Sequence, residues 1–302
     1  MSMRYQAGIV LPGYNPLKVP NAPTIGTATA GGGSASVTFT APSDVGGGAI
    51  TGYSVVSTPS GIIGTGASSP ITVSGLSIGT AYTFKVFATN AYGPSPLSAA
   101  SNSATPIPVI GSALGGGFFA GQISTAGNGI ADYNLVVGPV ASAQSASKQW
   151  KTTNTSTAGT TSVIDGPTNS SNMNNASHPA AQFCEAVNTG GFTDWYMPAR
   201  NELEVCYYNL KPTTQVNNTS SGINANAVPA RASNYTSGSP AQTSATDFQS
   251  TGAEDFAAGL YWSSTEFSTY YQAWGKYFTN GNQFGVLKST SYNVRAIRRV
   301  AV

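Results

Sequence analysis

The residues of this chain whose chemistry is easiest to interpret are aromatic and amide side chains close to the C-terminus. Aromatic rings stack on the CH faces of sugars and amides hydrogen-bond hydroxyl groups, and antibody binding surfaces use the same mixture of side chains. The pattern predicts a surface that binds a glycan or a protein, with at least three of these residues exposed on one face. The alternative is that about half of the tyrosines are buried in a sheet. The candidate residues are Tyr270, Tyr271, Gln272, Tyr277, Asn280, Asn282, Gln283, Phe284 and Tyr292.

The titratable residues do not form a catalytic pattern. His178 is the sole histidine and precedes a proline, which indicates a place at the start of a helix, and one histidine with two separated cysteines does not make a zinc site. Glu202 and Glu204 point apart if they lie on a helix, and the pair Glu254 and Asp255 falls in an expected loop. We therefore expect no enzyme, no catalytic residues, no metal and no cofactor. A glycan-cleaving depolymerase that uses one of these carboxylate pairs is the least favoured alternative.

Composition excludes some partners. The chain has 302 residues, of which only 8% are charged, and its formal net charge is +2. A surface that is polar without being ionic is typical of extracellular adhesive or particle-bound β proteins. The 13 basic residues are scattered, so we expect no nucleic-acid partner. No apolar run approaches the roughly 18 residues of a membrane span, and the first residues lack the apolar segment of a secretory signal, so we expect no membrane insertion.

Two short helices are predicted on either side of a Gly190-Gly191 turn. The first runs over residues 180–187 after a possible serine cap at Ser177, and the second ends at Lys211-Pro212. Helical spacing places four residues of the second helix on one face, namely Leu203, Cys206, Tyr207 and Leu210. Cys184 and Cys206 thus lie on different helices. We expect both thiols to be buried and free, and a disulfide between the helices is the alternative.

Four blocks of sequence after residue 190 resemble a known family. They are Asp-Trp-Tyr-Met-Pro-Ala-Arg-Asn-Glu-Leu at 194–203, Tyr-Trp-Ser-Ser-Thr at 261–265, Ala273-Trp274 with Phe278, and Val-Arg-Ala-Ile-Arg at 294–298. In this order they resemble the Lcl C-terminal domains of bacteria and phages, which are similar to the C-type lectin fold. The resemblance covers roughly residues 118–302 and implies that the ligand face lies on the last strands and loops.

The same resemblance suggests where some side chains point. Trp274 and Phe278 are expected to face inward and Tyr277 outward, so the amine of Lys276 must find an acceptor inside the domain or reach water. Arg295 and Arg298 lie on opposite faces of an expected strand over 292–300. One of the two is therefore expected to pair with a carboxylate such as Asp194 or Glu202.

The N-terminal part has the pattern of a β-sandwich. Short alternating segments at 36–40, 51–56 and 82–88 are separated by Gly, Pro and Ser. Residues 76–82 and 90–94 resemble the E–F corner and F–G loop of a fibronectin type III domain. In that family Tyr82 would be the corner tyrosine, and Phe39 would replace the usual tryptophan of strand B. The module is expected to act as a spacer.

The predicted fold class is multi-domain and mainly β. An immunoglobulin-like sandwich of the fibronectin type III kind precedes an α+β domain that is C-type-lectin-like and has two short helices. In that domain a hairpin is expected across Asn128-Gly129, and residues 151–176 and 211–252 are expected to be long loops. The predicted organisation is an extended arm at 1–20, the sandwich at 21–107, a linker at 108–117 and the lectin-like domain at 118–302.

These features together predict a phage virion protein, either a tail fibre or another particle-surface adhesin. It would be assembled in the host cytoplasm, become extracellular on lysis, and recognise a host surface glycan or protein through its C-terminal domain. The proline-rich arm at 1–20 would attach it to other virion proteins, with a disordered terminus as the equal alternative, and it would form a homo-oligomer. A structural or decoration protein whose C-terminal domain packs against other subunits is the alternative function, and signal-independent bacterial secretion would leave the same sequence features.

Overall fold

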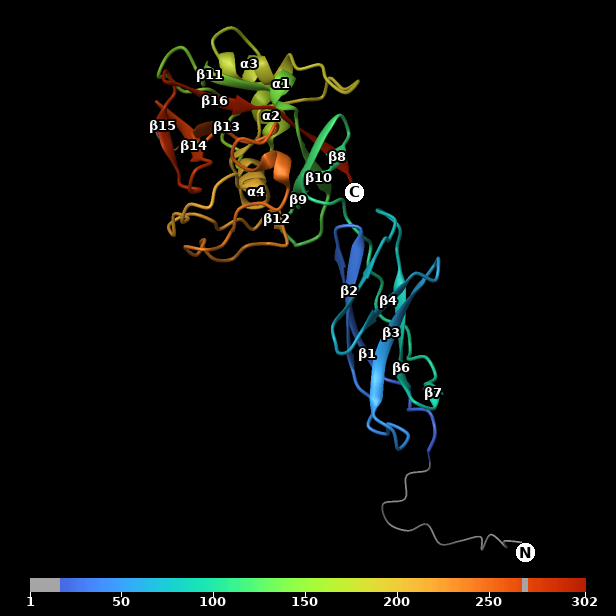
Figure 1. Ribbon diagram of the computed structural model, residues 1–302. Helices are drawn as coiled ribbons and strands as arrows, with labels where there is room; N and C mark the ends of the chain where they lie inside the picture. The colour runs from blue at the N-terminus through green and yellow to red at the C-terminus, as the bar shows by residue number, and fades with distance from the viewer. Residues whose placement is uncertain (1–16, 268–270) are drawn as a thin grey trace, which may run out of the picture. The chain divides into compact units, whose positions relative to one another are not determined.

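The computed structural model describes residues 17–267 and 271–302 (Figure 1). The chain divides into two compact units, one up to Val109 and the other from Ile110 onward. Most of the expected arm at residues 1–20 therefore lies outside the described residues. Within the described ranges, no helix has both the length and the apolar character needed to cross a membrane.

The first unit is an antiparallel sandwich of two sheets. Alternate residues of the strands point inward, as the period-two pattern predicted, and form one apolar core. The three-stranded sheet has the order β1 (Thr24–Gly31), β2 (Ser34–Thr40), β5 (Ile71–Ser74). The four-stranded sheet has the order β4 (Ile63–Gly66), β3 (Ile50–Thr58), β6 (Thr83–Asn90), β7 (Gly93–Pro94).

The corner tyrosine of the first unit is present. Tyr82 is buried, and its hydroxyl oxygen accepts a hydrogen bond from the backbone N–H of Ser77 at 3.1 Å. Phe39 is buried on β2, with its ring centroid 4.8 Å from that of Tyr53. The prediction of a fibronectin-like sandwich with these two residues in its core is confirmed.

The second unit contains two five-stranded sheets. The first has the order β12 (Ala227–Val228), β9 (Gly117–Ile123), β10 (Tyr133–Val137), β17 (Ile297–Ala301), with β8 (Ala113–Leu114) also paired to β9. The second has the order β11 (Gln144–Gln149), β16 (Ser291–Arg295), β13 (Leu260–Glu266), β14 (Gln272–Tyr277), β15 (Gln283–Leu287). β9 and β10 form the predicted hairpin. Only the pairing of β13 with β16 is parallel among the strands of the described ranges.

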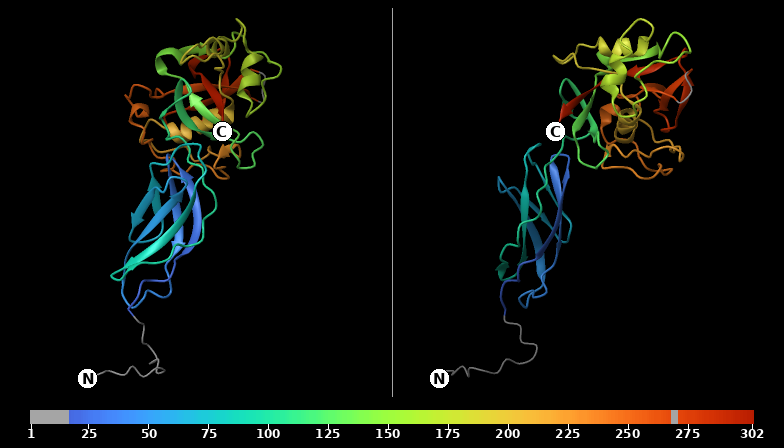
Figure 2. Two further views of the ribbon diagram at one scale, coloured as in Figure 1. Left: turned by 90° about the vertical axis from the view of Figure 1, so that its right-hand side faces the viewer. Right: turned by 180° about the vertical axis from the view of Figure 1, so that it is seen from behind.

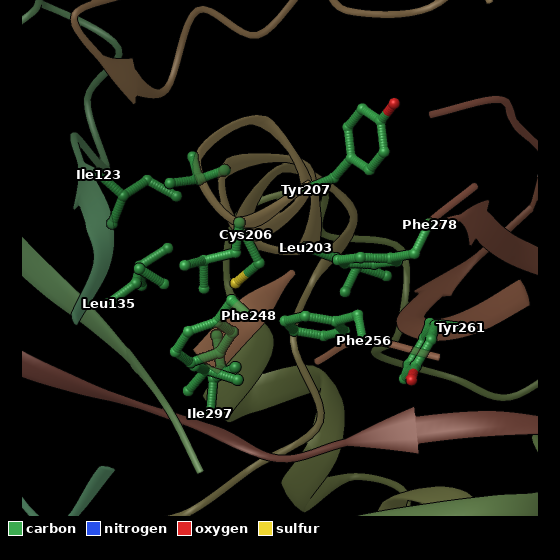
Figure 3. Close-up of a cluster of buried hydrophobic side chains, with 14 of the residues drawn as sticks. Ile123, Leu135, Leu203, Cys206, Tyr207, Phe248, Phe256, Tyr261, Phe278 and Ile297 are labelled. Atoms are coloured by element: carbon green, nitrogen blue, oxygen red, sulfur yellow. The ribbon is translucent and has the colours of Figure 1, made fainter. Parts of the chain in front are cut away.

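Helix α4 (Arg200–Leu210) joins the two sheets, because it contacts β9 and β10 of one and β13 and β14 of the other. The four residues predicted to share its apolar face are all buried. Figure 3 shows Leu203 and Cys206 directed from this helix into a cluster that also contains Leu135 and Ile297. Phe256 and Phe278 stack in the same cluster with their ring centroids 3.9 Å apart. The long segment after α4, gold to orange in Figure 2, is mostly irregular, as predicted.

Three expectations about local structure are wrong. Residues 110–117 are not a linker, because β8 pairs with β9 and Ile110 packs against the core of the second unit. The described part of this unit has four α-helices rather than two, since α1 (Val140–Ala143) and α2 (Gly166–Ser171) accompany α3 (Pro179–Glu185) and α4. The expected strand over 292–300 is broken at Ala296 into β16 and β17, which belong to different sheets.

The missed helix α2 has a clear local cause. Asp165 caps it by accepting a hydrogen bond from the backbone N–H of Thr168 at 3.2 Å, and Pro167 stands in its first turn. Both signals are present in the sequence Asp-Gly-Pro-Thr but are hidden in a stretch of low apolar content. A further short 3₁₀ helix, η1 (Thr246–Phe248), buries Phe248 within the loop after α4.

The two cysteines are buried and free. Cys184 on α3 belongs to one apolar cluster and Cys206 on α4 to the other, and burial raises the pKa of both thiols. The expectation of two small buried thiols is confirmed, and the alternative of a disulfide between the helices is wrong.

Candidate functional site

A pocket of about 310 Å³ opens where the first residue of α4 meets β14 and the edge strand β15. Part of its wall comes from the irregular segment that follows α4. Side chains from distant parts of the sequence meet there. The residues that line it are Arg200, Ser220, Ser221, Gly222, Ile223, Asn234, Trp274 and Gln283. We refer to it below as the Arg200 pocket.

Contacts within the Arg200 pocket hold its central side chain in place. The guanidinium carbon of Arg200 lies 4.0 Å from the ring centroid of Trp274, and Arg200 Nε donates a hydrogen bond to Gln283 Oε1 at 3.2 Å. The Gln283 amide in turn donates to the Arg200 backbone oxygen at 3.4 Å, and the Gln283 backbone N–H donates to Ser221 Oγ at 3.2 Å. The guanidinium is therefore stacked and tethered before any ligand arrives.

The position of Trp274 depends on the pairing of β14 with the edge strand β15. Trp274 lies opposite Gly285, and a Cβ at Gly285 would approach the Phe267 ring to 2.8 Å. The missing side chain gives Phe267 room to pack edge-on against Trp274, with 4.6 Å between their ring centroids. Trp274 is thus supported by Phe267 and by Arg200.

Behind the pocket, Lys276 is fully buried. Its amine donates to the hydroxyl of Tyr235 and to the backbone oxygen of Gly281, both at 3.1 Å. The Tyr235 hydroxyl donates to Glu204 at 2.5 Å, and Glu204 also forms an ion pair with Arg231. Burial lowers the pKa of Lys276 to about 7, an effect that Glu204 opposes and the nearby Arg231 and Arg200 reinforce. The expectation that this amine finds internal acceptors is confirmed.

Two domain families match the chain. Residues 142–298, more than half of it, match the Lcl C-terminal domain. The chain belongs to the Lcl C-terminal domain family. Residues 21–104 match the fibronectin type III domain, so the order of the two domains is as predicted, and this combination fits an adhesin-like protein. The range matched to the Lcl C-terminal domain contains every residue that lines the Arg200 pocket.

Similar solved structures overlap only a part of the chain. Titin kinase with its flanking domains is 30% identical over 28% of this chain and 17% of that one, with a TM-score of 0.25. Titin domains A168–A170 are 29% identical over 29% of this chain and 32% of that one, with a TM-score of 0.26. The twitchin kinase region of C. elegans is 21% identical over 30% and 17%, with a TM-score of 0.27. No curated protein matches the chain.

The Lcl C-terminal domain does not gather the predicted binding residues on one exposed face. Tyr270 lies outside the described residues, and Tyr271, at 40% exposure, is the one exposed member among the described others. The other described candidates are half-buried and lie in different parts of the sheet and its turns. Gln272 and Gln283 share the face of Trp274. Asn280 and Asn282 belong to the turn between β14 and β15. The aromatic residues pack against the apolar cluster that contains Cys184; they are Tyr277, Phe284 and Tyr292.

Two expected directions of side chains need correction. Trp274 is half-buried at the Arg200 pocket instead of pointing into the core, and Tyr277 is packed against an apolar cluster instead of pointing out. Phe278 is fully buried, as expected. The face of β14 that carries Lys276 is covered by α4 through Tyr207, whereas Trp274 is contacted by Arg200, the first residue of that helix.

Several other charged residues of the domain form ion pairs with one another. Arg298 pairs with Asp194 through two hydrogen bonds of 2.8 and 2.9 Å, which confirms the expected partner, but Arg295 pairs with Glu254. Glu202 accepts a hydrogen bond from Arg299 Nε at 2.8 Å. Within the described ranges, no group of three or more His, Cys, Asp or Glu residues could hold a metal ion.

His178 has a structural environment. It occupies the N-cap position of α3, which was expected for Ser177, but its side chain makes no capping hydrogen bond. Its ring nitrogens lie 2.9 Å from Thr157 Oγ1 and 2.9 Å from Asn175 Oδ1. Burial lowers the pKa of His178 to about 4, helped by the charges of Lys151 and Lys288. The neutral imidazole of His178 therefore connects the loop that contains Thr157 to the start of α3.

The predicted binding residues included only one of the eight described residues that line the Arg200 pocket. Arg200 stands in the family motif but was not predicted to be a binding residue. Other lining residues come from irregular chain, where no periodic pattern of side chains marks them, among them Ser221, Ile223 and Asn234. The available signal was the aromatic and amide content of β14 and β15, which did identify Gln283.

Proposed function

We propose that the protein is a phage virion adhesin, in a tail fibre or elsewhere on the particle surface, that recognises a host surface glycan or protein. Recognition would take place at the Arg200 pocket of the Lcl C-terminal domain. The fibronectin type III domain would act as a spacer, and the N-terminal arm would attach the chain to other virion proteins. The chain would act as a homo-oligomer, assembled in the host cytoplasm and made extracellular on lysis.

One observation carries the proposal. The Arg200 pocket combines a stacked guanidinium, a half-buried indole, an amide and hydroxyl groups, and mutual hydrogen bonds between Arg200 and Gln283 hold it in shape. A concave site with a few converging polar groups is the usual form of a small-ligand site. Rigid positioning of those groups reduces the entropy cost of binding.

We also propose that the site binds without catalysis. The carboxylates that a glycosidase mechanism would recruit are engaged elsewhere, since Glu202, Glu204 and Glu254 each accept hydrogen bonds from an arginine. Asp255 accepts the backbone N–H of Thr251 at 3.0 Å. A pair of carboxylates facing a scissile bond would have to break these contacts first.

The test is saturable binding of the full-length chain to cells of a susceptible host and to polysaccharide extracted from them. The informative variant is Ile223→Ala/Asn234→Ala, because both side chains are exposed and line the pocket. Losing one apolar and one polar contact of about 1 kcal/mol each predicts roughly a tenfold or greater loss of affinity.

The matched control is Val216→Ala/Thr219→Ala, which removes similar groups from exposed positions of the same irregular segment outside the pocket. It should bind like the wild type. If the folded wild type does not bind a susceptible host at all, the adhesin function is wrong and a structural role with packing between subunits takes its place. Equal binding by both double variants would move the receptor site away from the Arg200 pocket.

A further inference from the structure

Arg200 differs from the other arginines of the domain. The structure describes five arginines, and four of them form ion pairs with carboxylates. Within the described ranges Arg200 has no such partner, and its guanidinium makes one hydrogen bond, through Nε to Gln283. The two terminal nitrogens of its guanidinium thus have no protein acceptor there, although the group is half-buried.

Positive charges outnumber unpaired negative charges around Arg200. Glu204 is the carboxylate whose charge acts on Arg200, and it already forms an ion pair with Arg231. Lys276 adds a second cation behind the pocket whenever it is protonated. Among the described residues that line the pocket, none is acidic. Burial accordingly lowers the pKa of Arg200, and the group would gain a compensating charge from an anion.

We propose that the Arg200 pocket binds a sugar unit that carries a carboxylate, such as a uronic acid within a surface polysaccharide. This inference rests on the proposed adhesin function and names its ligand class. The carboxylate would accept hydrogen bonds from the terminal nitrogens of Arg200, and the sugar hydroxyls would bind Ser220 and Asn234. The volume of about 310 Å³ is at the small end of ligand sites and suits one or two sugar units.

Geometry favours a carboxylate over a phosphate or sulfate ester. A guanidinium offers two parallel N–H donors in one plane, which match the two oxygens of a planar carboxylate. Stacking on Trp274 already fixes the plane of the Arg200 guanidinium. A phosphate monoester would bring a charge of nearly two, whereas the pocket itself contributes one arginine.

The experiment compares three forms of one acidic polysaccharide with the full-length protein. They are a uronic-acid polymer, the same polymer with its carboxyl groups reduced to primary alcohols, and a sulfated neutral polymer of matched length. We expect the wild type to bind the first at least tenfold more tightly than the other two. Asn234→Asp, a change at an exposed position that brings a competing carboxylate to the pocket, should abolish this preference. Arg200→Gln should do the same.

Lys148→Met is the control, because it removes a positive charge of the same domain that does not line the pocket. It should keep the preference for the uronic-acid polymer, and tryptophan fluorescence checks that each variant is folded. Equal affinity for the carboxylated and reduced polymers would overturn the carboxylate assignment. Tighter binding of the sulfated polymer would also overturn it.

Failure of this inference is distinguishable from failure of the proposed function. If the protein binds host cells and loses that binding in Ile223→Ala/Asn234→Ala, but ignores carboxyl reduction, the adhesin stands and its ligand class is wrong. If the protein binds no host cell and no polymer, both are wrong. Binding to the uronic-acid polymer that Arg200→Gln and Asn234→Asp leave intact would place the acidic sugar at another site and overturn the inference.

Discussion

Replacement of Lys276 tests the physical account of the domain interior. Its amine is fully buried, and burial lowers its pKa from 10.5 to about 7. In the unfolded chain the amine keeps its proton up to about pH 10, so unfolding between pH 7 and 9 takes up nearly one proton. Stability must then rise with pH in this window. The free energy of unfolding should increase by roughly 1.4 kcal/mol per pH unit at most, or about 2 kcal/mol over the window.

We predict that Lys276→Met removes this increase. Methionine has a similar length and no charge, but it gives up the hydrogen bonds to Tyr235 and Gly281, each worth about 1 kcal/mol. When the pH is lowered from 9 to 7, the free energy of unfolding of the wild type should fall by about 2 kcal/mol and that of the variant should not. The stability of the variant relative to the wild type should then rise by about 2 kcal/mol. Below pH 6 the difference should stay constant, because the amine is then protonated in both the folded and the unfolded state.

The assay is urea unfolding of the full-length chain followed by tryptophan fluorescence. The four tryptophans, at positions 150, 195, 262 and 274, all lie in the second unit, so the signal reports that unit alone. Lys148→Met, at a half-exposed site on β11, serves as the control and should keep the wild-type pH dependence. An unchanged rise between pH 7 and 9 in Lys276→Met would refute the reasoning and show that Glu204, acting through Tyr235, keeps the lysine charged.

Three further predictions concern stability and thiol access. Tyr82→Phe should destabilise the first unit by about 1 kcal/mol, because the backbone N–H of Ser77 loses its acceptor; calorimetry of the full chain would measure this, and an unchanged transition would contradict it. Between pH 6.5 and 4 the unfolded chain protonates His178 while the buried ring stays neutral, so the wild type should lose up to about 3 kcal/mol. His178→Gln should lose less, as measured by urea unfolding at each pH. Cys184 and Cys206 should react with a thiol reagent only after unfolding, and rapid labelling of the native chain would argue against their burial.

Local patterns were sufficient for much of the fold. Helix α4 and the β9–β10 hairpin follow from spacing within about ten residues, where periodicity and turn chemistry act directly. The corner tyrosine Tyr82 was predicted from the resemblance to the fibronectin type III family. The break of the last strand at Ala296 could not be predicted in this way, because it arises where the chain passes from one sheet to the other. Helix α2 was missed because its capping signals were outweighed by low apolar content.

The Arg200 pocket shows what local patterns omit. Period two correctly places Trp274 and Lys276 on the same face of β14, yet only the lysine is fully buried, because α4 covers that face along part of its length. The pocket wall depends on contacts between distant segments, such as the backbone N–H of Tyr235 donating to the Ser221 oxygen at 2.8 Å. No feature of either residue's neighbourhood in the sequence specifies that contact.

Several of the few charges of this chain form ion pairs in its interior. Arg295 and Lys288 are fully buried; of their carboxylate partners, Glu266 is buried and Glu254 is partly exposed. A buried ion pair adds little net stability over an apolar pair, but loss of one partner costs about 3–5 kcal/mol, so such pairs specify which segments meet. Arg200 departs from this pattern because, within the described ranges, no carboxylate pairs with it, and this departure supports a ligand as its missing partner.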